Sequence, residues 1–433
     1  MRTALAGWTL AVTVYLLAVL HRTSLGVVGL LAEQRFGITP AQLSIFIFLQ
    51  LGVYAAMQVP TGVLVDRYGP RRILVVAAAL MGVAQLVFAL VPSYPAGLAA
   101  RAVLGCGDAL TFVSVLRFAA THFAPRRYPI VVALTSTVGM VGNVLATLPL
   151  AVLLHEAGWA AGFAGAAGLS LVAAVAVWLL LPDASPRPTA LHGVAGVRRG
   201  VNSVWTRVRG AWALPGTRLG FWVHFACMST ATSFGVLWGG PYLITAADFS
   251  TSGAGAVLMS GVIAAAIASP VLGWLIGHRP IVRVPIAIGV CLITLAGWTA
   301  VVAGFGTHPP RGYLVPLFIV MALGGPGSMT AFALARDYNH ARMLGTASGV
   351  VNVGGFLATV IIALGIGWVL DVQGGTNAAH FRWAVLVALV VQAWGTLRMT
   401  IWFIRLRRHV LDRQERGEAV PVQLMRRRWD RPA

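Results

Sequence analysis

Arg101 and Asp108 are two ionisable residues inside one apolar stretch of sequence, residues 96–123. An ionisable side chain at membrane depth costs about 2.5–3.5 kcal/mol on insertion scales, so each one needs a partner or a function. The two residues are seven positions apart, which is about two turns of a helix, so they share one helical face. On that face Arg101 suits the binding of an anionic group and Asp108 suits the carriage of a proton. The alternative is that they form structural ion pairs with another helix.

A second pair of ionisable residues, His21 and Arg22, interrupts the apolar run 5–31. About nine residues, or roughly 13 Å of helix, separate Arg22 from the end of this run. That distance exceeds the comfortable reach of an arginine, so we expect Arg22 to face an internal cavity; the alternative is that it snorkels to the interface. We therefore expect Arg22 and Arg101 to hold an anionic group. His21 is expected to assist Asp108 in carrying the proton.

Polar residues in other apolar runs extend this candidate site. One run carries a tyrosine and a glutamine four residues apart, and a histidine in another run shares a helical face with a tryptophan. Two further runs carry an asparagine close to glycines, as in closely packed helices that line a cavity. The predicted substrate-binding set is completed by Tyr54, Gln58, Asn143, Asn352, His224 and Trp238. For each of these residues the alternative is a hydrogen bond between helices.

Composition indicates a membrane protein with many spans. Of the 433 residues, 58% are hydrophobic and only 10% are charged, and the mean hydropathy is +0.81. A soluble protein needs more charge than this to cover its surface. All 32 basic residues are arginine, and the formal charge of +20 raises the question of nucleic acid as a partner. The arginines fall mainly between the apolar runs, however, which is the positive-inside pattern and excludes a nucleic-acid interface.

The sequence contains no recognisable catalytic constellation, so we expect neither an enzyme nor a bound cofactor or metal. Cys106, Cys227 and Cys291 lie in apolar runs far from one another in sequence, which predicts small core residues without a disulfide framework. The first apolar run has no convincing cleavage site and is expected to be a retained span. The expected partners are a small-molecule substrate and the lipid bilayer, and the expected state is a monomer.

About twelve apolar runs are long enough to cross a bilayer. Their approximate bounds are 5–31, 41–65, 73–92, 96–123, 129–154, 159–181, 219–246, 253–277, 281–304, 312–335, 344–370 and 382–404. The longest polar insertion divides them six and six, which predicts an all-α membrane protein of two six-helix bundles. The predicted parts are an N-terminal bundle (1–181), a cytoplasmic central loop (182–217), a C-terminal bundle (218–406) and a basic cytoplasmic tail (407–433).

The distribution of arginines predicts that both termini and the central loop are cytoplasmic. The central loop contains Trp205 and Trp212 among arginines. These residues are compatible with an amphipathic helix at the membrane surface or with a plain solvated linker.

The segment between the second and third runs combines an acid and three arginines around a Gly-Pro turn. Its pattern consists of Gly62, Asp66, Arg67, Gly69, Arg71 and Arg72. This G-x-x-x-D-R-x-G-x-R-R pattern resembles the loop between the second and third spans of major facilitator transporters. The resemblance implies a gating motif. Asp66 is expected to face the amino end of the run 344–370, where a helix dipole favours a carboxylate, with Arg117 as its partner.

The two halves of the chain contain an internal repeat. Residues 141–147 (VGNVLAT) parallel residues 353–359 (VGGFLAT) at an offset of 353 − 141 = 212. A similar shift of the gating motif leads to residues 273–279, which keep a glycine and basic residues but lack the acid. The agreement in offset indicates two related bundles, with an acidic gate contact in one of them only.

Other motifs resemble the anion:cation symporter branch of the same family. Arg101, Gly105 and Gly107 match the second motif of the major facilitator family, R-x-x-x-G-x-G, and the branch carries an acidic residue seven positions after this arginine, where this chain has Asp108. The branch carries an acid next to an arginine in its first span, where this chain has His21 and Arg22. The replacement of the acid by His21 puts the proton stoichiometry in question.

The resemblance implies a secondary transporter that works by alternating access in the cytoplasmic (inner) membrane. Two cations facing one carboxylate favour a small organic anion of the carboxylate type, moved together with protons. The alternatives are a carrier of amino acids or peptides, with or without proton coupling, and a drug exporter. A non-transporting membrane sensor is a further alternative outside transport.

Overall fold

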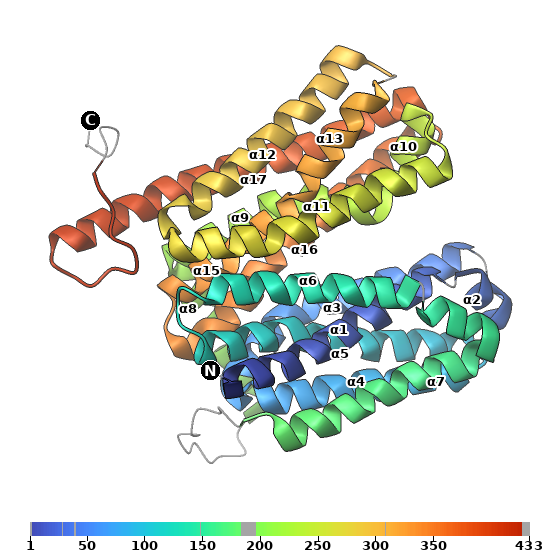
Figure 1. Cartoon of the computed structure of the whole chain (residues 1–433), viewed down its shortest axis with the longest axis horizontal. Helices are drawn as coiled ribbons and strands as arrows, with labels where there is room; N and C mark the ends of the chain where they lie inside the picture. The colour runs from blue at the N-terminus through green and yellow to red at the C-terminus, as the bar shows by residue number, and fades with distance from the viewer. Residues whose placement is uncertain are drawn as a thin grey trace. The chain divides into compact units, whose positions relative to one another are not determined.

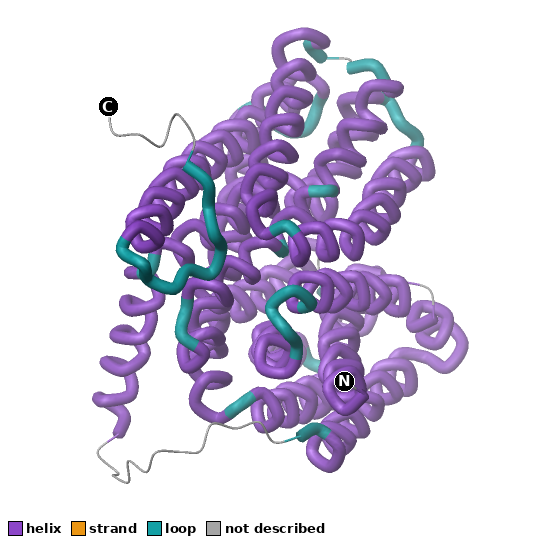
Figure 2. Tube along the Cα trace, turned by 60° about the vertical axis from the view of Figure 1, so that its left-hand side comes forward, coloured by secondary structure: helices purple, strands orange, loops and turns teal. Residues whose placement is uncertain are grey.

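The structure, a computed structural model, describes residues 2–27, 29–38, 40–147, 149–182, 196–307 and 309–426. Within these residues all regular secondary structure is helical, and no strand occurs (Figure 2). The first part contains α1 (Arg2–Val27), α2 (Gly29–Phe36), α3 (Pro40–Tyr68), α4 (Pro70–Leu90), α5 (Tyr94–His122), α6 (Tyr128–Thr147) and α7 (Pro149–Leu180). The second part contains α8 (Gly196–Ala213), α9 (Pro215–Ser233), η1 (Phe234–Trp238), α10 (Gly239–Ala247), α11 (Thr251–His278), η2 (Pro280–Val282), α12 (Arg283–Ala300), η3 (Val301–Phe305), α13 (Arg311–Ala322), α14 (Gly324–Ser328), α15 (Thr330–Tyr338), η4 (Ala341–Met343), α16 (Leu344–Val372) and α17 (Ala378–Glu415).

The helices match the predicted membrane spans. Ten helical stretches of the described residues are long and apolar enough to cross a membrane. The two remaining predicted runs lie on α3 and on the continuous path α9–η1–α10. Large apolar side chains such as Leu179 and Trp368, each 68% exposed, lie on the outside of the helices, as expected for a surface in contact with lipid. The prediction of an all-α, twelve-helix membrane fold is confirmed.

The boundary between the fifth and sixth spans lies where the sequence predicts it, between the runs 129–154 and 159–181. Helical structure covers the run 129–154 in α6 and the first part of α7, on either side of residue 148, which lies outside the described residues. α7 then bends at Gly158, whose φ of 82° is readily adopted only by glycine. Because Gly158 falls between the two predicted runs, the bend separates the fifth span from the sixth at the predicted place.

Helical structure also extends into the predicted loop and tail. Trp205 and Trp212 lie in α8, so this part of the central segment is a helix and not a plain linker. Residues 183–195 lie outside the described residues. The last predicted span ends at residue 404, whereas α17 continues to Glu415.

The chain forms two compact units. Unit 1 comprises Met1–Ala124, Leu134–Arg209 and Ala341–Gly349, and unit 2 comprises Pro125–Ala133, Gly210–His340 and Val350–Ala433. The first turn of α6 therefore belongs to unit 2, and the first turn of α16 belongs to unit 1. The predicted domain bounds follow the order of the chain and remain a prediction.

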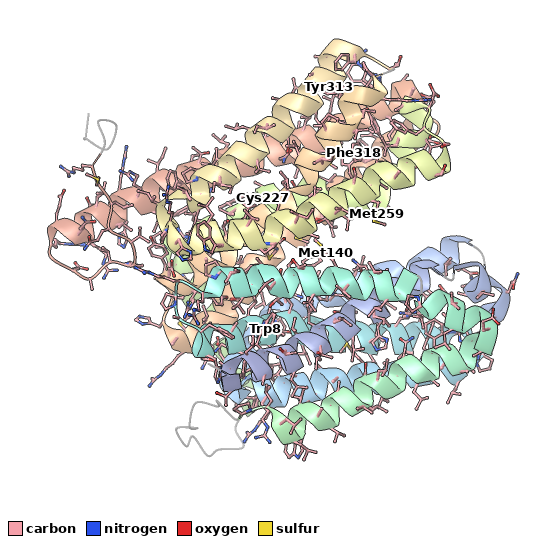
Figure 3. All side chains as sticks on the ribbon, in the orientation of Figure 1. Trp8, Met140, Cys227, Met259, Tyr313 and Phe318 are labelled. Carbon is pink, nitrogen blue, oxygen red and sulfur yellow. The ribbon has the colours of Figure 1, made fainter. Side chains whose placement is uncertain are left out.

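Each unit has its own aromatic core. In unit 1, α4 packs against α5 and α7 (Figure 1), and Phe88 of α4 lies 5.3 Å from Trp159 and 5.5 Å from Phe163. In unit 2, the ring centre of Trp298 lies 4.7 Å from that of Phe234 and 5.9 Å from that of Phe318. Phe318 is labelled in Figure 3. Such interlocking rings favour one packing arrangement of the helices. Specific packing matters here because lipid is as apolar as the core, so apolar burial alone does not drive the helices together.

Candidate functional site

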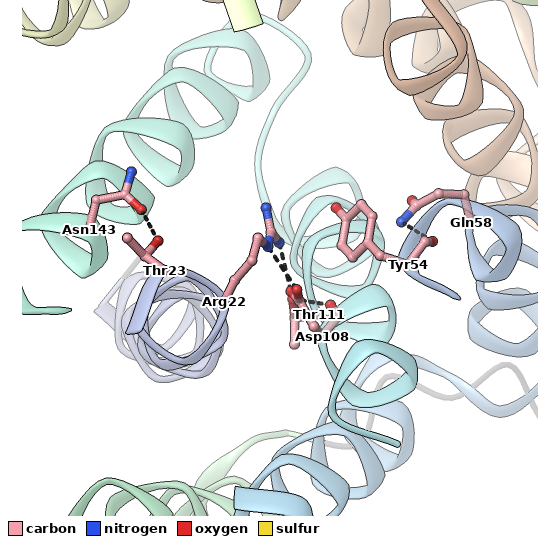
Figure 4. Close-up of polar contacts among 7 residues, drawn as sticks. All are labelled: Arg22, Thr23, Tyr54, Gln58, Asp108, Thr111 and Asn143. Carbon is pink, nitrogen blue, oxygen red and sulfur yellow. Dashed lines mark hydrogen bonds and ion pairs between the residues drawn. The ribbon is translucent and has the colours of Figure 1, made fainter. Parts of the chain in front are cut away.

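Arg22 of α1 and Asp108 of α5 form a two-point ion pair in unit 1 (Figure 4). Arg22 Nε lies 2.7 Å from Asp108 Oδ2, and Nη2 lies 2.6 Å from Oδ1. The Asp108 side chain is fully buried, whereas 22% of the Arg22 side chain is exposed. The ring of Tyr54 from α3 lies 4.5 Å from the guanidinium carbon of Arg22, within the range of a cation–π interaction. Arg22 is therefore the member of the pair that another anion can reach.

Two glycines of α5 allow its neighbours to come close to the ion pair. A Cβ atom on Gly105 would lie 2.8 Å from the backbone oxygen of Gln50 in α3. A Cβ atom on Gly107 would lie 3.0 Å from the backbone oxygen of Ala77 in α4. The R-x-x-x-G-x-G pattern thus positions α5 between α3 and α4, with Asp108 directly after its second glycine.

Three other predicted residues of unit 1 lie around this pair, as Figure 4 shows. The Thr23 hydroxyl donates to Asn143 Oδ1 at 2.6 Å and so links α1 to α6. Gln58 Nε2 donates to the backbone oxygen of Tyr54 at 3.1 Å. The structure therefore brings Tyr54, Gln58 and Asn143 together with Arg22, although their role in binding remains a prediction.

Arg101 takes no part in the Arg22–Asp108 ion pair. Its side chain is fully buried, and its guanidinium carbon lies 4.1 Å from the ring centre of Phe88. Nη1 donates to the backbone oxygen of His21 at 3.1 Å and to Gln50 Oε1 at 3.3 Å. In the described part of the chain, no carboxylate lies within ion-pair distance of Arg101. The shared helical face did not bring Arg101 to Asp108, because α1 supplies the partner of Asp108 instead.

The His21 side chain is also buried, and it points to a different neighbour. Its Nε2 lies 2.7 Å from the hydroxyl of Ser170 in α7, so it links α1 to α7. Ser170 was not singled out in the sequence, because a serine in an apolar run carries no distinctive signal. The predicted proton-carrying role of His21 remains a prediction.

In unit 2, two predicted residues meet. His224 Nε2 of α9 lies 3.2 Å from Asn352 Oδ1 of α16, and both side chains are buried. Gly355 makes this approach possible, because a Cβ atom there would lie 2.8 Å from His224 Nε2. Trp238 lies elsewhere. Its Nε1 donates to the backbone oxygen of Ala363 at 3.0 Å, and its ring packs against the aromatic core of unit 2.

The gating motif makes the contact that its sequence predicts. Asp66 accepts hydrogen bonds from the backbone nitrogens of Gly345 and Thr346, each at 2.8 Å, at the amino end of α16. The Thr346 hydroxyl donates at 2.9 Å, and Arg117 Nε lies 3.3 Å from Asp66 Oδ1. The predicted contact with the start of α16 and the predicted ion pair with Arg117 are therefore confirmed, while the gating role is not yet tested.

The other motif residues shape the turn and its surroundings. Gly69 has a φ of 81° and is followed by Pro70, so α3 ends and α4 begins without an intervening loop. Arg71 donates to the backbone oxygen of Trp178 in α7, and Arg67 lies 5.2 Å from the ring centre of Tyr68. Arg72 is exposed.

One close pair of cysteines was not predicted from the sequence. Cys227 of α9 and Cys291 of α12 are both buried, and their sulfurs lie 3.6 Å apart. Residues 64 positions apart carry no spacing signal, so this contact became visible only in the structure. Among the described residues, no group of three or more His, Cys, Asp or Glu side chains could hold a metal ion.

A many-span helical membrane protein with a partly exposed cation on a buried carboxylate has the architecture of a transporter. The model of the Major Facilitator Superfamily matches residues 11–363, and the chain belongs to this family. It is a multi-pass membrane transporter and not an enzyme.

Individual proteins resemble the chain at lower levels of identity. The probable galactarate/D-glucarate transporter GudP of Escherichia coli is 22% identical over 408 residues, which covers 86% of this chain and 89% of GudP. The probable sulfoacetate transporter SauU of Cupriavidus necator is 28% identical over 185 residues, or 41% of this chain and 42% of SauU. The fold is similar to the crystal structure of FucP in the outward conformation, with a TM-score of 0.71, 14% identity, and coverage of 93% of this chain and 99% of that chain.

Proposed function

We propose that the protein is a secondary transporter of a small organic anion, coupled to protons. The observation that supports this proposal is the Arg22–Asp108 pair, in which the cation is 22% exposed and the carboxylate is fully buried. A substrate carboxylate or sulfonate has the planar or tripodal oxygens that a guanidinium binds at two points. It can therefore replace Asp108 as the partner of Arg22.

Replacement would leave Asp108 buried without a counter-ion. Breaking a buried ion pair costs about 3–5 kcal/mol, because one charge remains uncompensated. Asp108 avoids this cost by taking up a proton. The site then holds a cation, a bound anion and a neutral carboxylic acid, so its net charge is the same before and after binding. This exchange couples one anion to one proton.

Other residues have supporting roles in this proposal. Tyr54 holds the guanidinium of Arg22 by its ring, and Gln58 and Asn143 supply polar contacts to the substrate. For His224, Asn352 and Trp238 of unit 2, the role in substrate binding remains a prediction. Arg101 and His21 are buried, so contact with the substrate would require α1 and α5 to move apart.

The named relatives support the choice of an acidic substrate. GudP is named for galactarate and D-glucarate, and SauU for sulfoacetate, all of which carry carboxylate or sulfonate groups. FucP is described as a fucose:proton symporter. We further propose that the protein is a monomer in the cytoplasmic (inner) membrane with both termini in the cytoplasm.

Uptake into proteoliposomes that contain a pH-sensitive dye tests this function. With D-glucarate outside, we expect uptake of the anion together with acidification of the interior, and no uptake of the neutral sugar fucose. Arg22→Ala should abolish both signals. Equal uptake by Arg22→Ala and the unchanged protein would refute the anion site, and uptake without acidification would refute the coupling.

A further inference from the structure

The first turn of α6 packs closely onto the end of α11 within unit 2. A Cβ atom on Gly273 would lie 2.8 Å from both Ala133 Cβ and Ile130 Cα. A Cβ atom on Gly277, one turn later, would meet the backbone oxygen of Arg126. Two glycines one turn apart therefore hold the backbone of this turn against α11.

An aromatic ring and a cation secure the same turn. The Tyr128 side chain is 1% exposed, and the guanidinium carbon of Arg336, at the end of α15, lies 4.7 Å from its ring centre. At this distance a cation over a ring is attracted by the negative face of the π system. Since Tyr128 is the first residue of α6, this contact ties the start of α6 to α15.

A buried ion pair fixes the position of Arg336. Arg283 Nε donates to the backbone oxygen of Ile276 in α11 at 2.9 Å, and Nη1 pairs with Asp337, the residue after Arg336. Arg283 is 4% exposed. The ends of α11 and α15 are thus joined, and together they form the surface on which Tyr128 lies.

The internal repeat relates this contact to the one made by Asp66. Gly62 and Gly345 are in close contact, since a Cβ atom on Gly345 would lie 2.6 Å from the backbone oxygen of Gly62. Gly273 corresponds to Gly62 (273 − 62 = 211), and Ala133 corresponds to Gly345 (345 − 133 = 212). The same steric contact occurs in both units, although the second one has no carboxylate at the helix start.

We propose that Tyr128 and Arg336 are positioning residues for transport, which form an acid-free counterpart of the Asp66 contact. α6 passes from unit 2 to unit 1 at residues 133 and 134, as α16 passes from unit 1 to unit 2 at residues 349 and 350. Any displacement of one unit against the other must bend or release these turns. The start of α16, where the chain passes from unit 1 to unit 2, is thus held by the carboxylate of Asp66. The start of α6, where the chain passes from unit 2 to unit 1, is held by the cation–π contact between Tyr128 and Arg336. This inference rests on transport as such and is independent of the proposed substrate.

Hydrogen exchange of the full-length protein in lipid nanodiscs, without substrate, tests the proposal. We expect amides of residues 128–134 to exchange about tenfold faster in Tyr128→Ala and in Arg336→Gln, and no faster in the double variant than in either single one. Tyr128→Phe and Arg336→Lys keep the ring and the charge and should exchange at the original rate. Tyr68→Ala, which removes the exposed ring next to Arg67, serves as the control.

The same variants separate positioning from simple stability. Asp66→Asn should accelerate exchange at residues 345–349 and leave residues 128–134 unchanged. In proteoliposomes, Tyr128→Ala and Arg336→Gln should lower the maximal uptake rate severalfold, and Tyr128→Phe should restore it. Unchanged exchange in Arg336→Gln, additive effects in the double variant, or unchanged uptake would overturn the proposal. If Tyr128→Ala does not fold, the comparison of Arg336→Gln with Arg336→Lys decides.

Discussion

Asp108 is fully buried and, in the described chain, has Arg22 as its charged partner at two points. A lysine cannot reproduce this geometry, because its ammonium group is a point charge without a planar fork. A hydrogen bond to a charged group contributes about 1.5–3 kcal/mol, which corresponds to roughly a tenfold to hundredfold change in affinity. We therefore expect Arg22→Lys to lower the affinity for anions at least about tenfold, as measured by concentration-dependent uptake. The matched control is Arg382→Lys, because Arg382 Nε donates to the backbone oxygen of Val302 in unit 2 and not to a carboxylate. This variant should have little effect on the affinity.

Removal of the titrating group should separate binding from coupling. The amide of asparagine is always neutral. In this variant Arg22 therefore has no carboxylate partner that the substrate must displace, and no group that takes up a proton when the substrate binds. We expect Asp108→Asn to retain exchange of internal for external anion, while anion uptake no longer acidifies the liposome interior. Loss of exchange with an intact fold would mean that Asp108 acts in substrate binding and not in proton carriage.

At the scale of single residues, the sequence predicted only part of the candidate site. A charged side chain inside a membrane span is energetically costly. On this ground, the sequence identified Arg22, Arg101 and Asp108 as residues that need a partner or a function. Spacing within one helix led to Arg101 as the neighbour of Asp108, whereas the structure pairs Asp108 with Arg22. Helical periodicity gives the face of a side chain but not the helix that lies opposite, so partners between helices could not be derived.

Among the elements, the interrupted helix α13–α14–α15 packs closely against α9. A Cβ atom on Gly324 would meet the backbone oxygen of Cys227 in α9, whereas one on Gly325 would meet nothing within 4 Å. Overpacking of a close contact typically costs about 1–3 kcal/mol. We expect Gly324→Ala to lower the thermal unfolding temperature in detergent and Gly325→Ala to leave it nearly unchanged. Equal melting of the two variants would contradict the close packing of α9 on α14.

The elements themselves were largely predictable. Twelve apolar runs led to helices at the expected places, because length and hydropathy suffice to recognise a span. The bend at Gly158 falls between the runs 129–154 and 159–181, so the boundary between the fifth and sixth spans was predictable as well. The continuation of α17 to Glu415 was missed, because a helix can leave the apolar layer without ending.

For the whole molecule, the arginines predict which ends of the helices face the cytoplasm. We expect Arg72→Cys, at the turn between α3 and α4, to react with a membrane-impermeant maleimide only after permeabilisation of spheroplasts. Ser93→Cys, at the turn between α4 and α5, should react from outside without it. The background for both is Cys106→Ser, because Cys106 is partly exposed while the other two cysteines are buried. Reversed labelling would invert the proposed topology.

The exchange of first turns between the units has a consequence for the protein as two fragments. A cut in the segment 183–195 would separate most of unit 1 from most of unit 2, but it would leave residues 341–349 on the second fragment and residues 125–133 on the first. The first fragment alone would then expose Gly62 and the carboxylate of Asp66, which normally receive the start of α16. Each fragment therefore lacks a piece that only the other supplies. Synthesised separately, the halves should be prone to degradation, whereas joint synthesis should let them complement each other into one functional carrier.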